Sequence, residues 1–214
     1  MPDFSHERDL LKKGYRIIAG FDEAGRGSLA GPFSVGCVVY NSDFILNPPE
    51  IVFEIINDSK KLTAKKRNSA LTYILNNTLF ASAHLVPHKV VDNLNINGAT
   101  KFSISMLIEK LPVKPDALLI DGNFKFDFGI PTFNIKNGDS QSLSIAAASI
   151  VAKVKRDEIM MRMDTIYPGY GFAQNMGYGT SSHRIAIQTN GPSPIHRLTY
   201  EPLKGMLASE NSNK

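Results

Sequence analysis

The sequence IIAGFDEAGRG, residues 17–27, is the most informative segment for the fold of this chain. The apolar and partly β-branched run over residues 15–21 predicts a β-strand that ends where Asp22 and Glu23 begin. The glycine-rich end of the stretch then predicts a tight turn. A second apolar run, residues 33–40, predicts a strand that pairs with the first as a hairpin around this turn.

The apolar pattern on either side of this segment predicts a mixed sheet with helices packed on it. Further strands are expected over residues 80–86, 117–120 and 132–135, and helices over residues 60–76, 87–93, 99–110, 140–166, 181–190 and 198–207. The helix over 140–166 has the strongest pattern, and its three alanines, Ala146–Ala148, favour a close approach to the sheet. We expect an α/β fold in one domain, with a core over residues 15–165 and a helical C-terminal region over 166–208.

The bulk properties indicate an ordinary globular protein. With 214 residues, 43% apolar and 21% charged, the chain is neither a fibre nor a disordered protein. A net charge of +4 is compatible with a nucleic-acid partner. The single cysteine, Cys37, excludes an intramolecular disulfide and favours a reducing compartment. The sequence shows no signal peptide or membrane-spanning run, so a cytoplasmic protein that does not bind membranes is expected.

Acidic residues stand at the ends of two predicted strands and at the start of the strongest predicted helix. Asp22 and Glu23 follow one strand, Asp121 follows another, and Asp139 precedes the helix. Acids are common turn residues, and Asp139 is also well placed to cap the helix. Carboxylates that converged would repel one another, and a divalent ion would relieve the repulsion. All-oxygen sites prefer Mg²⁺ or Mn²⁺, and two such ions suit phosphodiester cleavage.

Two further features have both a functional and a purely structural interpretation. The turn Gly25-Arg26-Gly27 allows a ligand to approach the backbone, but it also suits a simple hairpin. Basic residues cluster around Lys60 and around Lys153 and Arg156. Such clusters are typical of solvated helix faces, and they also suit contacts with backbone phosphates.

Six motifs in order resemble those of the ribonuclease HII family. They are GFDEAGRGSLAGP (20–32), DSKKL (58–62), IDGN (120–123), GD followed by SIAAASIVAKV (138–139 and 144–154), GYGT (177–180) and PSPIHR (192–197). The resemblance covers residues 15–204, nearly the whole chain. It implies an RNase H-like fold, a mixed five-stranded sheet flanked by helices with a helical C-terminal region.

The resemblance also implies an activity. Family members cut 5′ to a ribonucleotide, in RNA–DNA hybrids and at ribonucleotides embedded in duplex DNA, with Mg²⁺ or Mn²⁺. This implies two ions with substrate bound, a role in removing ribonucleotides during DNA repair, and, as a further expectation, a monomer. The metal-ligand positions carried over by motif are Asp22, Glu23, Asp121 and Asp139. The substrate-contact positions are Gly25, Arg26 and Gly27, which read the 2′-OH, Tyr178, which stacks beside the junction, and Lys60, which contacts phosphate. From its basic cluster, Lys153 is expected to contact phosphate as well.

The chain departs from the family pattern at three positions where a basic residue is frequent. Asn137, Gln141 and Met176 stand there instead, so we expect weaker and more salt-sensitive binding of substrate. Three other classes of protein fit the sequence less well. The sister ribonuclease HIII usually carries an added N-terminal domain, a binding protein without catalysis would not need all four acids, and a small-molecule phosphohydrolase would not need the ribose-reading turn.

Overall fold

The computed structural model describes residues 1–57, 59 and 62–206, so the Lys60 and Lys61 predictions lie outside the described residues. The chain divides into two compact units, which we call the sheet unit and the helical unit. The sheet unit consists of Met1–Ala24, Ser34–His84 and Thr100–Val154. The helical unit consists of Gly25–Phe33, Leu85–Ala99 and Lys155–Lys214. No helix in the described part of the chain is long and apolar enough to cross a membrane.

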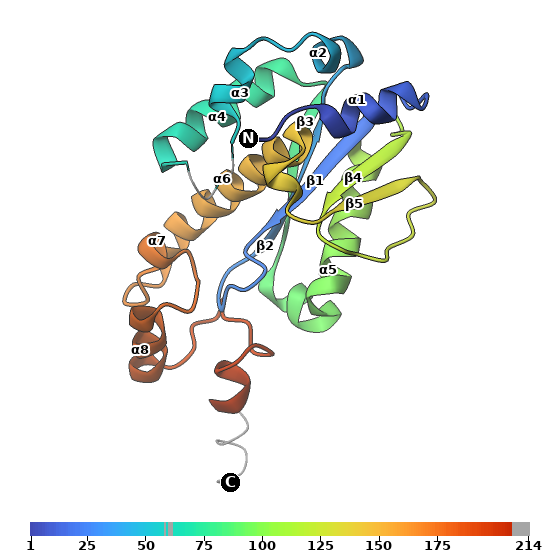
Figure 1. The fold of residues 1–214 in the computed structure, drawn as a ribbon. Helices are drawn as coiled ribbons and strands as arrows, with labels where there is room; N and C mark the ends of the chain where they lie inside the picture. The colour runs from blue at the N-terminus through green and yellow to red at the C-terminus, as the bar shows by residue number, and fades with distance from the viewer. Residues whose placement is uncertain (58, 60–61, 207–214) are drawn as a thin grey trace. The chain divides into compact units, whose positions relative to one another are not determined.

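The sheet has five strands in the order β3-β2-β1-β4-β5 (Figure 1). The strands are β1 (Ile18–Ala24), β2 (Phe33–Val39), β3 (Phe80–Val86), β4 (Ala117–Asp121) and β5 (Thr132–Ile135). β1 runs antiparallel to β2 and parallel to β4, and β4 runs parallel to β5, which confirms the mixed five-stranded sheet.

β1 begins and ends three residues later than predicted. The hairpin ladder continues as far as Ala24, so Asp22 and Glu23 lie within the end of the strand. In that ladder Asp22 stands opposite Gly36 of β2, and Glu23 stands opposite Val35. The two carboxylates are therefore held by hydrogen-bonded strand backbone rather than by a loop.

Eight α-helices are described. They are α1 (Ser5–Lys12), α2 (Ser42–Leu46), α3 (Ile51–Ile55), α4 (Ala64–Asn77), α5 (His88–Lys110), α6 (Leu143–Ile166), α7 (Phe172–Asn175) and α8 (Ser181–Asn190). The first three and α7 were not predicted. α4 begins later than predicted because the hydroxyl of Thr63 accepts the amide hydrogen of Lys66 and caps the helix there. The final predicted helix is described only at residues 203–206.

α5 merges the two helices predicted over residues 87–93 and 99–110. Its backbone leaves the helical region at Asn95, which has a φ of 55°. The Asn95 side-chain oxygen accepts the backbone amides of Asn97 and Gly98, 2.9 and 3.1 Å away. The gap left between the two predicted helices therefore corresponds to a real break in the helical backbone.

The alanine-rich face of α6 packs directly on the sheet, as predicted. A Cβ atom added at Gly20 of β1 would lie 2.6 Å from Ser144, and one at Gly36 of β2 would lie 2.1 Å from the carbonyl oxygen of Ala148. In both cases the atoms that the added Cβ would meet belong to the backbone or the Cβ of α6, which cannot turn aside as a flexible side chain could. Only glycine therefore fits at either strand position. The close approach brings the helix within reach of the acidic residues on β1.

A buried carboxyl group, Glu7 of α1, lies at the start of α6. Glu7 Oε1 accepts hydrogen bonds from the hydroxyl of Ser142, at 2.6 Å, and from the backbone amide of Ser144, at 3.0 Å. Glu7 Oε2 is buried and has no hydrogen-bond partner among the described residues. Burial raises the pKa of this carboxyl group, and the two hydrogen bonds only partly oppose the shift.

We expect Glu7→Gln to stabilise the protein at pH 8. The raised folded-state pKa means that the contribution of Glu7 to stability is fully present below its ordinary value of 4.5 and is lost as the pH rises through the folded pKa. Glutamine keeps an acceptor for Ser142 and carries no charge. Thermal unfolding between pH 4 and pH 8 should show a higher Tm for the variant at the alkaline end, by about 2–4 °C per kcal/mol recovered. A variant that melts lower than the wild type at pH 8 would contradict this assignment.

Candidate active site

Asp22 and Asp121 lie at the same edge of the sheet. The parallel register pairs Phe21 of β1 with Ile120 of β4, and each aspartate is the next residue along its strand. Asp22 is only 5% exposed. Burial and then the charge of Asp121 hold the pKa of the Asp22 carboxyl group well above its usual range, with Glu23 adding a smaller repulsion. A buried carboxylate with two acidic neighbours is a site that attracts a cation.

Asp139 reaches the same region through the 3₁₀ turn Gly138–Ser140, which follows β5. Asp121 Oδ1 accepts the backbone amide of Gly138 at 2.6 Å, so the residue before Asp139 is tied directly to Asp121. Asp139 is 6% exposed. The alternative that Asp139 caps α6 is wrong, because the hydroxyl of Ser142 accepts the amide of Ile145 and caps that helix instead.

A pair of buried serines lies behind Asp22. A hydrogen bond from the side chain of Ser149 on α6 lowers the pKa of the Asp22 carboxyl group, in opposition to burial. The Ser149 hydroxyl is 2.9 Å from the hydroxyl of Ser59. An ionised carboxylate can only accept, so Ser149 donates to Asp22 and Ser59 donates to Ser149. This pair was not predicted, although a serine on the apolar face of a predicted helix was a signal for it.

The donor chemistry at this edge fits a hard divalent cation. The acids are oxygen donors, and their mutual repulsion is the kind that such an ion relieves. Among the described residues no group of three or more His, Cys, Asp or Glu side chains is arranged so that it could hold a metal ion. Asp121 and Asp22 each direct an oxygen to a backbone amide, that of Gly138 and that of Glu23.

The turn that follows β1 belongs to the helical unit and is held firmly on one side. The backbone carbonyl of Arg26 accepts hydrogen bonds from Arg197 Nη1, at 3.0 Å, and from the hydroxyl of Tyr200, at 3.1 Å. The Arg26 guanidinium donates to the side-chain oxygen of Asn97. Gly25 is buried with a φ of 84°, whereas Gly27 is exposed. Exposed backbone on a fixed turn is suited to contact a ligand.

Tyr178 lies beside this segment, in an isolated bridge with Ser28. Its side chain is 37% exposed. Its carbonyl accepts a hydrogen bond from His183 Nδ1 at 2.9 Å, and His183 Nε2 is 3.1 Å from His196 Nε2. His196 and Arg197 are buried, and the Arg197 guanidinium donates to the carbonyl of Gly31.

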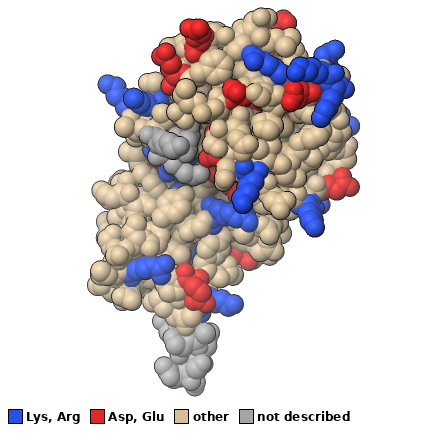
Figure 2. All heavy atoms as spheres, viewed as in Figure 1, with Lys and Arg blue, Asp and Glu red and all other residues tan. Residues whose placement is uncertain are grey.

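The basic residues differ in their surroundings. Lys153 of α6 is half-buried. The interpretation of Arg156 as a phosphate contact is wrong, because its side chain is completely buried and donates to Ser28 and to the carbonyls of Ala30 and Pro32. Figure 2 shows Lys and Arg side chains in several separate groups on one face, with acidic side chains between them.

The three departures from the family pattern lie in turns. Asn137 and Met176 adopt left-handed backbone conformations, with φ of 55° and 50°. Gln141 donates to the carbonyls of Lys136 and Asn137, at 2.7 and 3.2 Å. Gln141 therefore stabilises the turn that carries Asp139.

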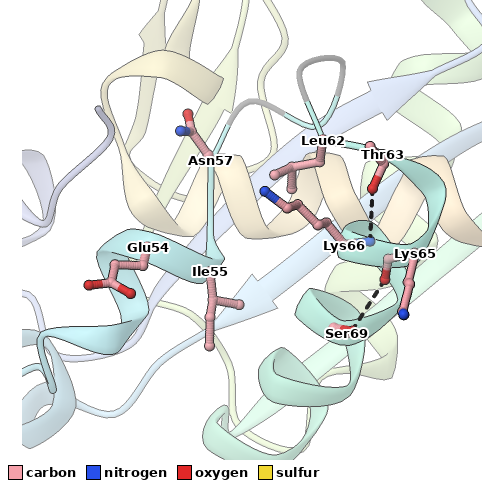
Figure 3. A pocket seen from close by; sticks show the side chains of 8 residues that line it. All are labelled: Glu54, Ile55, Asn57, Leu62, Thr63, Lys65, Lys66 and Ser69. Atoms are coloured by element: carbon pink, nitrogen blue, oxygen red, sulfur yellow. Dashed lines mark hydrogen bonds between the residues drawn. The ribbon is translucent and has the colours of Figure 1, made fainter.

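A cavity of about 700 Å³ lies in the sheet unit at the start of α4 (Figure 3). Lys65 and Lys66 line it together with Glu54 and Asn57. The figure also shows Thr63 capping the helix. None of the four candidate carboxylates, Asp22, Glu23, Asp121 and Asp139, lines this cavity, so the cavity is not part of the candidate metal site.

Comparison with known proteins points to one family. The family model described as ribonuclease HII matches residues 19–202. A ribonuclease HII from Geobacter sulfurreducens is 45% identical over 198 residues, which cover 92% of this chain and 88% of the relative. The crystal structure of ribonuclease H2 from Pyrococcus horikoshii OT3 matches with a TM-score of 0.75 at 24% identity, covering 92% of this chain and all of that one. That of Bst-RNase HIII in complex with Mn²⁺ matches with a TM-score of 0.63 at 19% identity, covering 92% of this chain and 71% of that one.

Proposed function

Because this chain belongs to the ribonuclease HII family and is therefore a ribonuclease H, we propose that it cuts the phosphodiester bond 5′ to a ribonucleotide. The substrates are RNA–DNA hybrids and duplex DNA with embedded ribonucleotides, and the role is ribonucleotide removal in DNA repair. The observation that supports this most strongly is the buried Asp22 with Asp121 and Glu23 beside it. The sister ribonuclease HIII is set aside by the family match.

We assign Asp22, Glu23, Asp121 and Asp139 as the residues that hold two Mg²⁺ or Mn²⁺ ions. The Mn²⁺ bound by Bst-RNase HIII supports this choice of ion. Bound ions supply Lewis acidity for the attacking water and for the leaving oxygen. Ser149 keeps the Asp22 carboxylate directed by its hydrogen bond, and the amide of Gly138 does the same for Asp121. The protein works as a monomer in the cytoplasm.

Recognition of the ribonucleotide is assigned to the Gly25–Gly27 turn and to Tyr178. Only the 2′-OH distinguishes RNA from DNA at one nucleotide, and it both donates and accepts. The exposed backbone at Gly27 offers hydrogen-bonding groups without a side chain in front of them. The partly exposed ring of Tyr178 offers a flat face for the neighbouring sugar. Lys60 and Lys153 are assigned to backbone phosphates, which position the duplex without reading sequence.

One assay tests the proposal as a whole. Three duplexes are incubated with the protein, with Mg²⁺ and with a chelator: an RNA–DNA hybrid, a DNA with one ribonucleotide, and an all-DNA control. We expect Mg²⁺-dependent nicks 5′ to the ribonucleotide in the first two only. Absence of cleavage on both would refute the activity, and equal cleavage of the all-DNA duplex would refute the ribose-reading assignment.

Gly27→Ala is expected to reduce cleavage without affecting the fold. A Cβ atom added at Gly27 meets no other atom within 4 Å, and its φ lies outside the left-handed region, so the Tm should be unchanged. In our assignment the added methyl group faces the ribose. We expect kcat/KM at a lone ribonucleotide to fall by roughly 10–100-fold, the usual cost of displacing a reacting group by a fraction of an ångström to an ångström. An unchanged kcat/KM would contradict the assignment of Gly27 to recognition of the 2′-OH.

A further inference from the structure

We propose that Arg156 is a positioning residue for ribonucleotide recognition, whose buried guanidinium holds the Gly25 turn and the Tyr178 ring in one fixed arrangement. The inference rests on the proposed function, because it assigns a purpose to residues taken there to read the ribose. All the contacts that support it lie within the helical unit. Arg156 is fully buried, so it acts through these neighbours rather than by touching substrate.

The N–H groups of the guanidinium donate hydrogen bonds to the segment that follows the turn. Nε donates to the carbonyl of Pro32 at 2.9 Å, and Nη2 donates to the hydroxyl of Ser28, at 2.8 Å, and to the carbonyl of Ala30, at 3.3 Å. Three acceptors within five residues are therefore gathered by one side chain. This fixes the path of the chain immediately after Gly27.

The turn itself lies against the same group. A Cβ atom added at Gly25 would be 2.0 Å from Arg156 Nε and 2.8 Å from Cζ, so the glycine backbone is packed on the guanidinium. Gly25 also has a φ of 84°, which disfavours any residue with a side chain. The two constraints together mean that the shape of the turn and the position of Arg156 depend on each other.

The guanidinium also lies over the ring of Tyr178. Arg156 Cζ lies 5.3 Å from the centre of the tyrosine ring. Nη1 is buried and has no hydrogen-bond partner among the described residues. A buried cationic N–H without an acceptor is costly, and an aromatic face is one surface that attracts it. The ring of Tyr178 is thereby held over the cation, while 37% of its side chain stays exposed.

Burial lowers the pKa of Arg156 to about 10, while the charge of the ionisable Tyr178 hydroxyl acts in the opposite direction. The group therefore remains a cation at neutral pH. Lysine has a single ammonium group, whose pKa burial also lowers, and it cannot bind the three acceptors and lie over the ring of Tyr178 together. Arg156→Lys is for this reason an informative substitution, because it keeps a long basic side chain and removes the planar set of hydrogen-bond donors.

The test compares kcat/KM on the RNA–DNA hybrid and on the DNA with one ribonucleotide. The variants are Arg156→Lys, Tyr178→Ala, their double mutant and, as a control, Arg162→Lys, which changes an exposed arginine of the same helix. We expect Arg156→Lys and Tyr178→Ala each to lower cleavage at the lone ribonucleotide by roughly tenfold or more relative to the hybrid. The double mutant should have the same ratio of kcat/KM on the two substrates as Tyr178→Ala alone, because both changes remove the same Arg156–Tyr178 contact. Arg162→Lys should match the wild type.

Independent losses that multiply in the double mutant would overturn the proposal, and so would an Arg156→Lys variant with the wild-type ratio. The Mg²⁺-induced rise in Tm without substrate gives a second readout, and it should equal that of the wild type. If Arg156→Lys does not fold, Ser28→Ala removes one acceptor of the guanidinium and should lower the same ratio by a smaller factor; an unchanged ratio then counts against the proposal. A wild type that does not discriminate ribose would refute the proposed function instead.

Discussion

Asp22→Asn is expected to lower the rate of Mg²⁺-dependent nicking by roughly three orders of magnitude, which corresponds to about 4 kcal/mol of lost transition-state stabilisation. In our assignment Asp22 is the most enclosed of the four metal ligands, with Asp121 and Glu23 beside it and Ser149 donating to it. Asparagine has nearly the same shape and carries no charge. The substitution therefore removes the attraction for the ions and leaves the packing in place.

The same variant should be at least as stable as the wild type in buffer with a chelator. Burial and the charge of Asp121 both disfavour the ionised Asp22, so its loss removes a repulsion. Mg²⁺ should then raise the Tm of the wild type by binding to the folded state, and it should raise that of the variant much less. Asp9→Asn, which changes an exposed acid of α1, is the control. Retention of more than about a tenth of the nicking rate would contradict the role of Asp22 as a ligand.

The sequence predicted the sheet well because its strands are short apolar runs with clear ends. β3 and β5 have the predicted bounds, and β4 differs only by including Asp121. The short helices α1, α2 and α3 were not predicted, since five to eight residues carry too little periodicity to be recognised. For α2 a local signal did exist: Asn41 accepts the amide of Phe44 at 2.6 Å as an N-cap.

The sequence suggested the residues of the candidate site but not their arrangement. The order of strands places Asp22 beside Asp121, and no pattern along the chain specifies which strands are neighbours. For Arg156 the sequence suggested the wrong environment. Its basic neighbours suggested a solvated face, yet Ala152, Arg156 and Met160 recur at intervals of four and are all buried. The helical spacing was a signal for burial that the prediction from charge clustering did not use.

Gly36→Ala is the substitution with the largest expected effect on stability. Its added Cβ atom would lie 2.1 Å from the carbonyl oxygen of Ala148 and 3.0 Å from the backbone nitrogen of Ala152, and neither backbone can move without shifting α6. Overpacking of this kind costs about 2–3 kcal/mol, so the Tm should fall by about 4–12 °C. Gly27→Ala, which meets no atom within 4 Å, is the matched control and should melt as the wild type does.

The consequence of Gly36→Ala should extend from stability to the metal centre. Gly36 stands directly opposite Asp22 in the β1–β2 ladder, and Ser149, which donates to Asp22, follows Ala148 on the displaced helix. Moving α6 away from β2 would therefore weaken the hydrogen bond that directs the Asp22 carboxylate. We expect the Mg²⁺ concentration for half-maximal nicking, measured at a temperature where the variant is folded, to rise by roughly 10–100-fold, the usual cost of losing an outer-shell partner. Ser149→Ala should reproduce the shift in Mg²⁺ dependence with a smaller loss of Tm. If Gly36→Ala lowers the Tm and leaves the Mg²⁺ dependence unchanged, the helix supports the fold but does not position the carboxylate.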